Sequence, residues 1–295
     1  MGLLSGTSAD AIDAVAVRID GRGDLTDLAA LAVPLDAEIQ DQILTLQSRS
    51  IELHELGELD KRLGEFFGNA AIRLLEENGI DRGKVQAIGS HGQTLLHKPN
   101  GEFPFTIQLG DPNTIAERTG VTTVADFRSR DISAGGQGAP LVPLFHQAWL
   151  GTMSDTAVLN MGGIANITVL AKEGAEPELG FDTGPANTLI DSWARLHLNK
   201  EFDEGGNWAE EGTVHAELLE TLLEHPYFER LPQKSVDVSE FGLKWLEGHL
   251  AAFSEIPPRD VAATIIELSA KSIALAMSRW AHNTKQVVQR GGSKW

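Results

Sequence analysis

The hydrophobic residues of the chain recur with two periods, one typical of strands and the other typical of helices. A short apolar run at 3–8 leads into a glycine turn, and a second run at 14–19 follows it, which predicts a β-hairpin. Apolar side chains then recur at intervals of three and four over 36–48 and 52–77, as expected of amphipathic helices. The other elements predicted in this half are strands at 85–90, 105–109 and 121–125 and a short helix that begins at Pro112.

The same order of elements begins again near residue 140. A helix is predicted over 139–150, and a second hairpin, 156–160 with 164–170, turns at Gly162-Gly163. The other elements predicted in this half are helices at 185–198, 214–224 and 258–281 and a last strand at 286–288. Each half of the chain therefore opens with a strand, a glycine turn and a strand.

This repetition predicts an α/β fold with two domains of related design. We expect the domains to span 1–145 and 146–295 and to hold a ligand in the cleft between them. A length of 295 residues is also sufficient for two domains, each with its own core.

Composition excludes several functional classes. The formal net charge is −18 and no block of Lys and Arg forms a basic stripe, so nucleic acid is not expected as a partner. The absence of cysteine excludes disulfides, thiolate metal sites and a cysteine nucleophile.

The sequence also shows no targeting signal. The first residues lack the basic and apolar parts of a secretion signal. The most apolar long stretch, 261–277, includes Glu267 and Lys271 and is therefore expected to fall short of a membrane span. These features predict a cytoplasmic protein with no membrane partner.

The first glycine turn, Gly6-Thr7-Ser8-Ala9-Asp10, has residue types that suit a phosphate site. Glycine lets the backbone approach a phosphate closely, the two hydroxyl side chains add donors, and Asp10 can bind Mg²⁺ directly or through water. The alternative is an ordinary polar turn whose side chains bond to their own backbone.

The second glycine turn, within Asn160-Met161-Gly162-Gly163-Ile164-Ala165-Asn166, stands at the equivalent place in the second half. By itself it is explained as a tight turn that needs a positive φ. Two such turns on opposed hairpins, however, can hold one nucleoside triphosphate from both sides. The pair therefore favours a shared phosphate site.

A third motif, Gly180-Phe181-Asp182-Thr183-Gly184-Pro185-Ala186-Asn187, predicts a strand end followed by a helix that Pro185 opens. An ionised Asp182 at this junction can accept a proton from a bound water or hydroxyl, and the N–H groups of the helix can hold a phosphate or sugar oxygen. The alternative is that Asp182 or Thr183 only caps the helix.

Polar side chains gather at predicted strand ends in the first half, at 90–94 and at 126–131. Such ends are the usual place for a polar ligand in an open α/β sheet. Arg128 or Arg130 can pair there with a substrate carboxylate. The alternatives are a hydrogen-bonded structural role for His91 and surface salt bridges for the two arginines.

Five segments taken in order closely resemble the anhydro-N-acetylmuramic acid kinases: GLLSGTSADAID, IGSHGQTLLHKP, ADFRSRDISAGGQGAPLVPLFH, NMGGIANIT and GFDTGPANTLID. The resemblance extends from Gly2 to Gly292. It implies two ribonuclease-H-like domains that close over ATP, as in the superfold of sugar kinases, heat-shock ATPases and actin. It also implies an activity in cell-wall recycling, in which 1,6-anhydro-N-acetylmuramic acid, ATP and water give N-acetylmuramic acid 6-phosphate and ADP.

The resemblance implies a role for each matching residue. Asp182 is the expected base, which deprotonates the water that attacks the anomeric carbon while O6 takes the γ-phosphoryl group. The residues implied to bind ATP are Gly6, Thr7, Ser8, Asp10, Asp13, Gly162, Gly163, Asn166, Gly291 and Gly292, with Asp10 also holding Mg²⁺. The residues implied to bind the sugar are His91, Gln93, Asp126, Arg128, Arg130 and Asn187, and which arginine faces the lactyl carboxylate is left open.

The chain departs from the pattern of the family at three places. Ala11 stands where the family has glycine, which is tolerated if φ there is negative. Only Met1 precedes Gly2, so the first strand is short. Few residues follow Gly292, whereas the family continues with elements that complete the adenosine pocket. We therefore hypothesise a shortened chain with weakened nucleotide binding.

Two other functions remain as alternatives to the kinase. One is a sugar- or nucleotide-binding homologue without turnover. The other is an ATP-independent glycan hydrolase that uses Asp182 and Asp126 as paired carboxylates, although the two glycine turns have no role in that mechanism. A homodimer is left open as the state of assembly.

Overall fold

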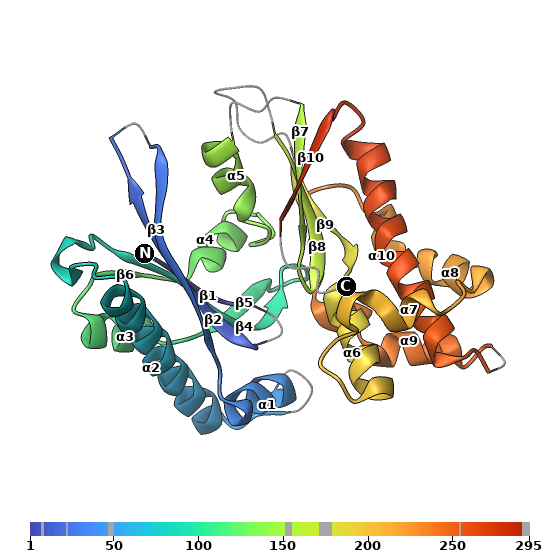
Figure 1. Ribbon diagram of the computed structural model, residues 1–295, viewed down its shortest axis with the longest axis horizontal. Coiled ribbons are helices and arrows are strands. Elements are labelled where there is room, and N and C mark those ends of the chain that lie inside the picture. The colour runs from blue at the N-terminus through green and yellow to red at the C-terminus, as the bar shows by residue number, and fades with distance from the viewer. Residues whose placement is uncertain are drawn as a thin grey trace. The chain divides into compact units, whose positions relative to one another are not determined.

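The computed structural model describes residues 1–6, 9–21, 23–46, 50–150, 155–170, 179–253 and 255–290. The chain divides into two compact units, Met1–Gly138 and Ala139–Trp295, which are drawn in Figure 1. The expected boundary after residue 145 would cut helix α5 (Val142–Leu150), which lies wholly in the second unit. The reason is tertiary, because α5 packs against strand β8 (Ile164–Val169) of that unit.

The first unit is built on a sheet with the order β3-β2-β1-β4-β5. β1 pairs antiparallel with β2, β2 pairs antiparallel with β3, and β1 pairs parallel with β4. The long strand β4 has different neighbours along its length: its start pairs with the short β6, and its end pairs with β5. The strands are β1 (Gly2–Ser5), β2 (Ala11–Ile19), β3 (Leu25–Pro34), β4 (Ile88–Lys98), β5 (Phe105–Leu109) and β6 (Thr123–Val124).

β3 and the second half of β4 are absent from the predicted elements. β3 is an edge strand whose side chains are mostly exposed, so its sequence shows little of the alternation that marks a half-buried strand. The chain after residue 90 is rich in polar side chains, yet it extends β4 to Lys98 because it pairs with β5. In both places, pairing with a neighbour decides the structure.

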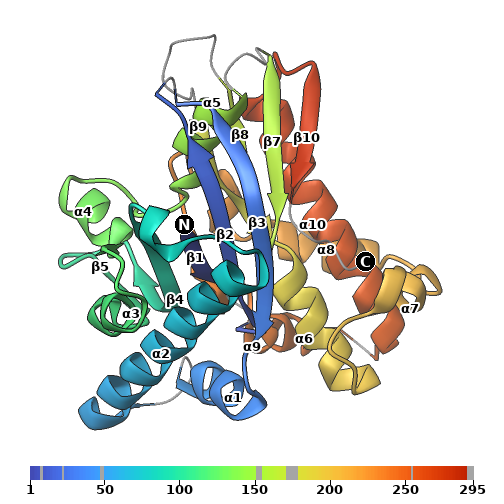
Figure 2. The same cartoon turned by 60° about the vertical axis from the view of Figure 1, so that its left-hand side comes forward.

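Helix α2 (Leu53–Glu77) covers one face of this sheet, as Figure 2 shows. It starts at a capping box in which the Glu55 carboxylate accepts the backbone N–H of Glu52 at 3.0 Å. Its buried side chains pack on those that alternate strand residues present to the same face, and the core includes Leu3, Ile12, Ala14, Leu59, Leu63, Phe67, Leu74 and Ile88. The other helices of this unit are α1 (Ala37–Leu46), α3 (Pro112–Thr119), α4 (Phe127–Ser133) and the single turn η1 (Arg82–Lys84).

The second unit repeats the strand arrangement of the first. Its sheet has the order β10-β7-β8-β9, in which β7, β8 and β9 are antiparallel and β10 is parallel to β7. Each sheet therefore holds three antiparallel strands in sequence and a later strand that runs parallel beside the first of them. The remaining strands are β7 (Thr156–Met161), β9 (Leu179–Pro185) and β10 (Gln286–Arg290).

Helix α10 (Pro258–Trp280) is the central helix of the second unit. It packs against β9 and against helices α6, α7 and α8, and its first residue accepts a hydrogen bond from the Trp193 indole at 2.8 Å. Besides α5 and α10, the described helices of this unit are α6 (Asn187–Leu198), α7 (Asn207–Glu210), α8 (Ala216–Leu223) and α9 (Leu243–Leu250), with the short turns η2 (Glu204–Gly206), η3 (Pro226–Glu229) and η4 (Val238–Phe241).

By length and composition alone, α10 is long and apolar enough to cross a membrane, which corrects the expectation that this stretch falls short of a span. Nevertheless, 44% of its most apolar window is buried inside the unit. Glu267 and Lys271 form an i,i+4 ion pair on its partly exposed side. Packing on β9 therefore accounts for its apolar character as a core helix.

Pro185 does not open a helix as predicted. It is the last residue of β9, paired with Ile164 of β8, and α6 begins two residues later at Asn187. Because β9 is an edge strand of its sheet, a residue without a backbone N–H is tolerated there. The local preference of proline for a first helical turn is overridden by strand pairing.

Candidate active site

The end of β1 brings the first glycine turn next to the polar residues in the middle of β4. The two strands run parallel and pair Ser5, the last residue of β1, with Gln93 of β4, so Gly6 begins the turn beside Gln93. The Gly6 carbonyl accepts the backbone N–H of Ala9 at 3.0 Å, which closes the turn. Thr7 and Ser8, two of the predicted ATP-binding residues, lie outside the described residues.

The backbone of this turn places its positive φ at Ala9 and not at Ala11. Ala9 has a φ of 49° and is fully buried, whereas Ala11 is the first residue of β2 and is not among the described residues with positive φ. An alanine is therefore unstrained at position 11, as the sequence analysis expected.

Asp10 and Asp13 form a pair of carboxylates beside the turn. Asp13 lies opposite Leu4 in the hairpin, on the face of the sheet that turns away from the α2 core. Partial burial raises the pKa of Asp13, and the negative charge of Asp10 raises it further. Two carboxylates that repel each other in this way are stabilised by a cation.

The pair fits the coordination chemistry of Mg²⁺. Within the described part of the chain, no group of three or more His, Cys, Asp or Glu side chains could hold a metal ion. Mg²⁺ does not need such a cage, because it is usually bound by one or two carboxylates together with substrate phosphates and water.

His91 is the extra residue of a β-bulge. β1 and β4 pair Leu3 with Ser90 and then Leu4 with Gly92, so His91 has no partner residue in the ladder. Gly92 has a φ of +73°, and a Cβ there would overlap with the carbonyl oxygen of Leu109. The bulge therefore requires glycine, and it aims the preceding side chain away from the regular alternation.

The half-buried His91 ring is hydrogen-bonded at both nitrogens. The Arg128 Nε–H, from the first turn of α4, donates to His91 Nε2 at 3.0 Å, and His91 Nδ1 lies 3.0 Å from the Gly92 carbonyl oxygen. Burial first, and then the guanidinium of Arg128, lower the pKa of His91 to about 4. The ring is therefore neutral at pH 7.

The other predicted sugar-binding residues of this unit lie in different surroundings. Gln93 is fully buried, and its Oε1 has no hydrogen-bond partner among the residues that the structure describes. Asp126 and Arg130 are exposed, and Asp126 has a φ of 57° immediately before α4. Of the two arginines, Arg128 is the one tied to the strand end by His91.

In the second unit, strand register places three polar residues in one row. β7 pairs Asn160 with Asn166 of β8, and β8 pairs Asn166 with Asp182 of β9. Residues directly opposite in neighbouring strands point to the same face of a sheet, so the three side chains are neighbours. The Oδ1 atom of Asn166 is buried and has no hydrogen-bond partner in the described ranges.

The second glycine turn is bonded to the start of α6. The Gly163 carbonyl accepts the N–H groups of Ala186 and Thr188 at 3.1 and 3.2 Å, and the Gly162 carbonyl accepts that of Asn187 at 3.1 Å. These three N–H groups are used by the turn, because the register of β8 and β9 brings the turn against them. A phosphate or sugar oxygen at the start of α6 stays a prediction.

Asp182 is buried and is held through its backbone and its side chain. Its N–H donates to the Lys234 carbonyl at 3.0 Å, its carbonyl accepts the Tyr227 hydroxyl at 2.8 Å, and its Oδ2 accepts the Val236 N–H at 3.1 Å. The capping alternative is wrong, because α6 has no side-chain cap and the Thr183 hydroxyl donates to the Ala165 carbonyl.

The partners Tyr227, Lys234 and Val236, which we call the Asp182 clamp, were missed by the sequence analysis. They lie 45 to 54 residues after Asp182, in a segment without motif or periodicity. The one available signal is compositional, since Tyr227 is the single tyrosine of the chain.

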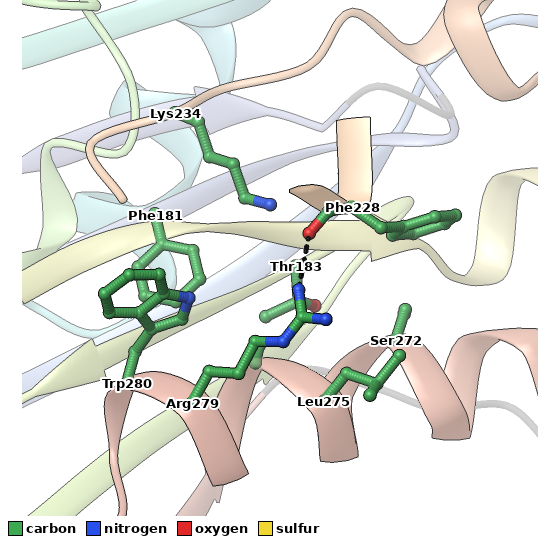
Figure 3. Close-up of a pocket in the computed structure, with 9 residues that line it drawn as sticks. Phe181, Thr183, Phe228, Lys234, Ser272, Leu275, Arg279 and Trp280 are labelled. Carbon is green, nitrogen blue, oxygen red and sulfur yellow. Dashed lines mark hydrogen bonds between the residues drawn. The ribbon is translucent and has the colours of Figure 1, made fainter. Parts of the chain in front are cut away.

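Lys234 is a buried lysine that reinforces the clamp. Its Nζ donates to the Tyr227 carbonyl at 2.9 Å and lies 4.4 Å from the centroid of the Tyr227 ring. Burial, followed by the charges of Arg230 and Arg279, lowers its pKa to about 8. Figure 3 shows Lys234 and Arg279 reaching into one small pocket, which Phe181 and Thr183 of β9 also line. The pocket lies against the residues on either side of Asp182.

The last predicted ATP-binding residues, Gly291 and Gly292, lie outside the described residues. What the structure does describe is a mixed α/β chain with two sheets, each with a turn after its first strand. Carboxylates follow each turn: Asp10 and Asp13 come directly after the first, and Asp182 lies opposite Asn166 of the strand that follows the second. This combination is typical of α/β phosphotransferases, which position phosphates on backbone turns and charged groups.

Comparison with known proteins gives the particular family. The sequence pattern of the family described as anhydro-N-acetylmuramic acid kinase matches residues 1–294. The chain belongs to this family.

Curated relatives agree with this assignment. A protein of Coxiella burnetii (strain Dugway 5J108-111), named anhydro-N-acetylmuramic acid kinase, is 46% identical over 93% of this chain and 73% of its own length. Proteins of the same name from Xylella fastidiosa and Xanthomonas oryzae pv. oryzae are 46% and 44% identical over 99% of this chain, which corresponds to 77% and 78% of their lengths.

Among solved structures, a ROK hexokinase from Thermus thermophilus is similar to 98% of this chain, over 91% of its own, with a TM-score of 0.35 and 14% identity.

Proposed function

We propose that this chain is a kinase that opens 1,6-anhydro-N-acetylmuramic acid with water and phosphorylates its O6 with ATP. The products are N-acetylmuramic acid 6-phosphate and ADP, which places the enzyme in cell-wall recycling in the cytoplasm. The observation that carries the proposal is the family match over residues 1–294, with curated relatives of that name at 44–46% identity over most of the chain.

The proposed reaction uses Asp182 as general base. Asp182 takes one proton from a water molecule, and the water oxygen forms a bond to the anomeric carbon. The bond from this carbon to O6 breaks, O6 takes the γ-phosphoryl group, and ADP leaves. The proton on Asp182 then passes to solvent. General base catalysis by a positioned carboxylate typically contributes about 10²- to 10⁴-fold to a rate.

The clamp supports this role. A carboxylate whose backbone N–H, carbonyl and Oδ2 all have fixed partners keeps its position when the substrate arrives. A base that is already oriented loses little entropy in reaching the transition state.

The phosphate chain of ATP is assigned to the two glycine turns. Gly6, Thr7 and Ser8 form the first site and Gly162, Gly163 and Asn166 the second, with Gly291 and Gly292 at the adenosine. Asp10, with Asp13 beside it, would hold Mg²⁺, which when bound supplies positive charge to the phosphates. The raised pKa of Asp13, due first to burial and then to the charge of Asp10, favours this pair as a cation site.

The sugar is assigned to the polar residues around α4 and β4. We assign its lactyl carboxylate to Arg128, because this arginine is half-buried and fixed by His91, whereas Arg130 is exposed. Gln93, Asp126 and Asn187 complete the proposed sugar site.

The same strand order in both units supports two ribonuclease-H-like domains.

The test is a direct assay with the wild-type chain and Asp182→Asn. Incubation with the anhydro-sugar, ATP and MgCl₂ should give a sugar 6-phosphate by mass spectrometry, and water labelled with ¹⁸O should place the label on the anomeric hydroxyl. Asp182→Asn should reduce kcat by about 10³-fold, because the amide cannot accept the proton. Binding of the sugar should persist in this variant.

Two results would replace the proposal. Release of unphosphorylated N-acetylmuramic acid without ATP would indicate the hydrolase. Binding of sugar and nucleotide with no product from the wild-type chain would indicate a binding protein without turnover.

A further inference from the structure

The contact between His91 and Arg128 fixes the chemistry of the histidine ring. A guanidinium Nε always carries hydrogen and cannot accept a hydrogen bond. The His91 Nε2 at 3.0 Å must therefore present a lone pair, so the ring proton is on Nδ1, where the Gly92 carbonyl accepts it at 3.0 Å. Nε2 of His91 therefore acts only as a hydrogen-bond acceptor, and Nδ1 acts only as a donor.

The backbone on both sides is shaped for this contact. On β4, the bulge that presents His91 depends on Gly92, where no other residue fits beside Leu109. On the α4 side, Gly138 has a φ of +66°, and a Cβ there would lie 3.3 Å from the Cβ of Arg128. The N–H of Gly138 is fixed in turn by Asp131 Oδ2 at 2.7 Å. Gly92 therefore permits the bulge that presents His91, and Gly138 leaves room for Ile132 and for the base of the Arg128 side chain.

We propose that His91 is a positioning residue that holds the Arg128 guanidinium in the orientation that binds the carboxylate of an acidic sugar. This inference rests on the proposed function, which assigns the lactyl carboxylate to Arg128. Because Nε–H is used by His91, a carboxylate meets the terminal nitrogens of the guanidinium, where a planar two-bond contact forms. His91 thus raises the affinity for acidic anhydro-sugars over neutral ones, without contacting the sugar itself.

A merely structural histidine makes a different prediction. It would lower stability and weaken sugar and ATP equally, whatever the residue at position 128. A positioning histidine acts only through Arg128, so its effect disappears once Arg128 is removed. The two roles are separated by a double-mutant cycle.

The experiment measures sugar binding by calorimetry, which does not depend on turnover. The variants are His91→Leu, His91→Gln, Arg128→Ala and the double variant, and the probe is 1,6-anhydro-N-acetylmuramic acid beside 1,6-anhydro-N-acetylglucosamine, which lacks the carboxylate. His91→Leu should weaken binding of the acidic sugar about tenfold, comparable to the loss of one charge-assisted hydrogen bond. His91→Gln should recover most of that loss, because its amide oxygen can accept from Nε.

In the Arg128→Ala background, His91→Leu should change the affinity for the acidic sugar by less than twofold. The affinity for the neutral sugar and for ATP should stay within twofold in every variant. His54→Leu, an exposed histidine on α2, is the matched control and should change nothing. By NMR, His91 should be the Nδ1–H tautomer, and its pKa should rise in Arg128→Ala, because the guanidinium contributes to lowering it.

Equal losses from His91→Leu in the presence and absence of Arg128 would overturn the proposal, as would an equal loss for ATP. Retained affinity in Arg128→Ala would overturn the assignment of the carboxylate to this arginine. A failure of the kinase function itself is distinguishable, because it appears as binding without product in the wild-type chain.

Discussion

The Tyr227 hydroxyl donates a hydrogen bond of 2.8 Å to the backbone carbonyl of Asp182. Tyr227 is fully buried, and its own carbonyl accepts the Lys234 Nζ, while the Lys234 carbonyl accepts the Asp182 N–H. The three residues therefore form a closed ring of hydrogen bonds around the proposed base. Burial is the main cause that raises the pKa of the Tyr227 phenol. The hydroxyl therefore keeps its proton and remains a donor at the pH values at which proteins are studied.

Tyr227→Phe removes the hydroxyl that donates to the Asp182 carbonyl inside the unit. We expect a loss of about 1 kcal/mol in the free energy of unfolding, since a buried hydrogen bond is lost. We also expect kcat to fall by roughly tenfold with little change in KM, because the base is less well positioned. Urea unfolding and steady-state kinetics measure the two effects.

Trp193→Phe is the control for this variant. It removes another hydrogen bond of 2.8 Å in the same unit, a partly buried one from the indole to the Pro258 carbonyl. Its stability loss should be similar while kcat stays near the wild-type value. A fall in kcat of equal size in both variants would argue against a specific role for Tyr227.

Lys234→Met should change how stability depends on pH. The pKa of Lys234 is about 8 in the folded chain against a usual 10.5, so between these values the unfolded state binds a proton that the folded state does not. The Lys234 contribution to stability is therefore lowest below pH 8 and rises with pH up to about 10.5, by at most about 1.4 kcal/mol per pH unit.

The measurement is the free energy of unfolding of both chains between pH 7 and about pH 10. The wild-type chain should gain stability relative to Lys234→Met as the pH rises. Lys271→Met, at an exposed position of α10, should leave the wild-type pH dependence in place. A difference between wild type and Lys234→Met that stays constant with pH would contradict the prediction.

Gly92→Ala should destabilise the first unit strongly. The new Cβ overlaps with the Leu109 carbonyl, and the φ of +73° is strained for alanine, so we expect a loss above about 3 kcal/mol or a chain that does not fold. Gly79→Ala is the control, because Gly79 also has a positive φ of 61° but has no atom within 4 Å of the added Cβ. That variant should lose only about 1 kcal/mol. Equal losses by urea unfolding would refute the steric argument.

Asp10→Asn should weaken the dependence of turnover on Mg²⁺. Removing one charge from the carboxylate pair should raise the Mg²⁺ concentration for half-maximal rate by tenfold or more, about 1.4 kcal/mol. The pKa of Asp13 should fall toward its usual value, because the Asp10 charge contributes to raising it. Asp41→Asn, on the exposed side of α1, serves as the control. An unchanged Mg²⁺ requirement in Asp10→Asn would exclude Asp10 as a ligand.

Local sequence patterns were sufficient for much of the element order. The amphipathic spacing that predicted helices at 52–77 and 258–281 corresponds to α2 and α10, and α3 begins at Pro112 as expected. These elements have strong signals within a few residues of one another. Where the signal depends on a distant partner, as in β3 and at Pro185, the sequence prediction failed.

The candidate site divides in the same way. The family motifs, which led to Asp182, Asp10 and the glycine turns, are runs of adjacent residues and can be recognised from the chain alone. The role of each matching residue stays a prediction. The partners that hold these residues are not visible in any local pattern.

What the sequence determined by itself was the family, the repeated strand–turn–strand opening and the residue types at each turn, because these depend on short-range chemistry. Only the tertiary structure decided that Asn166 lies opposite Asp182, that a bulge turns His91 toward Arg128, and that Tyr227 holds Asp182 across 45 residues of chain. Strand register and long-range hydrogen bonds form only after the sheets assemble, so no window of sequence contains them.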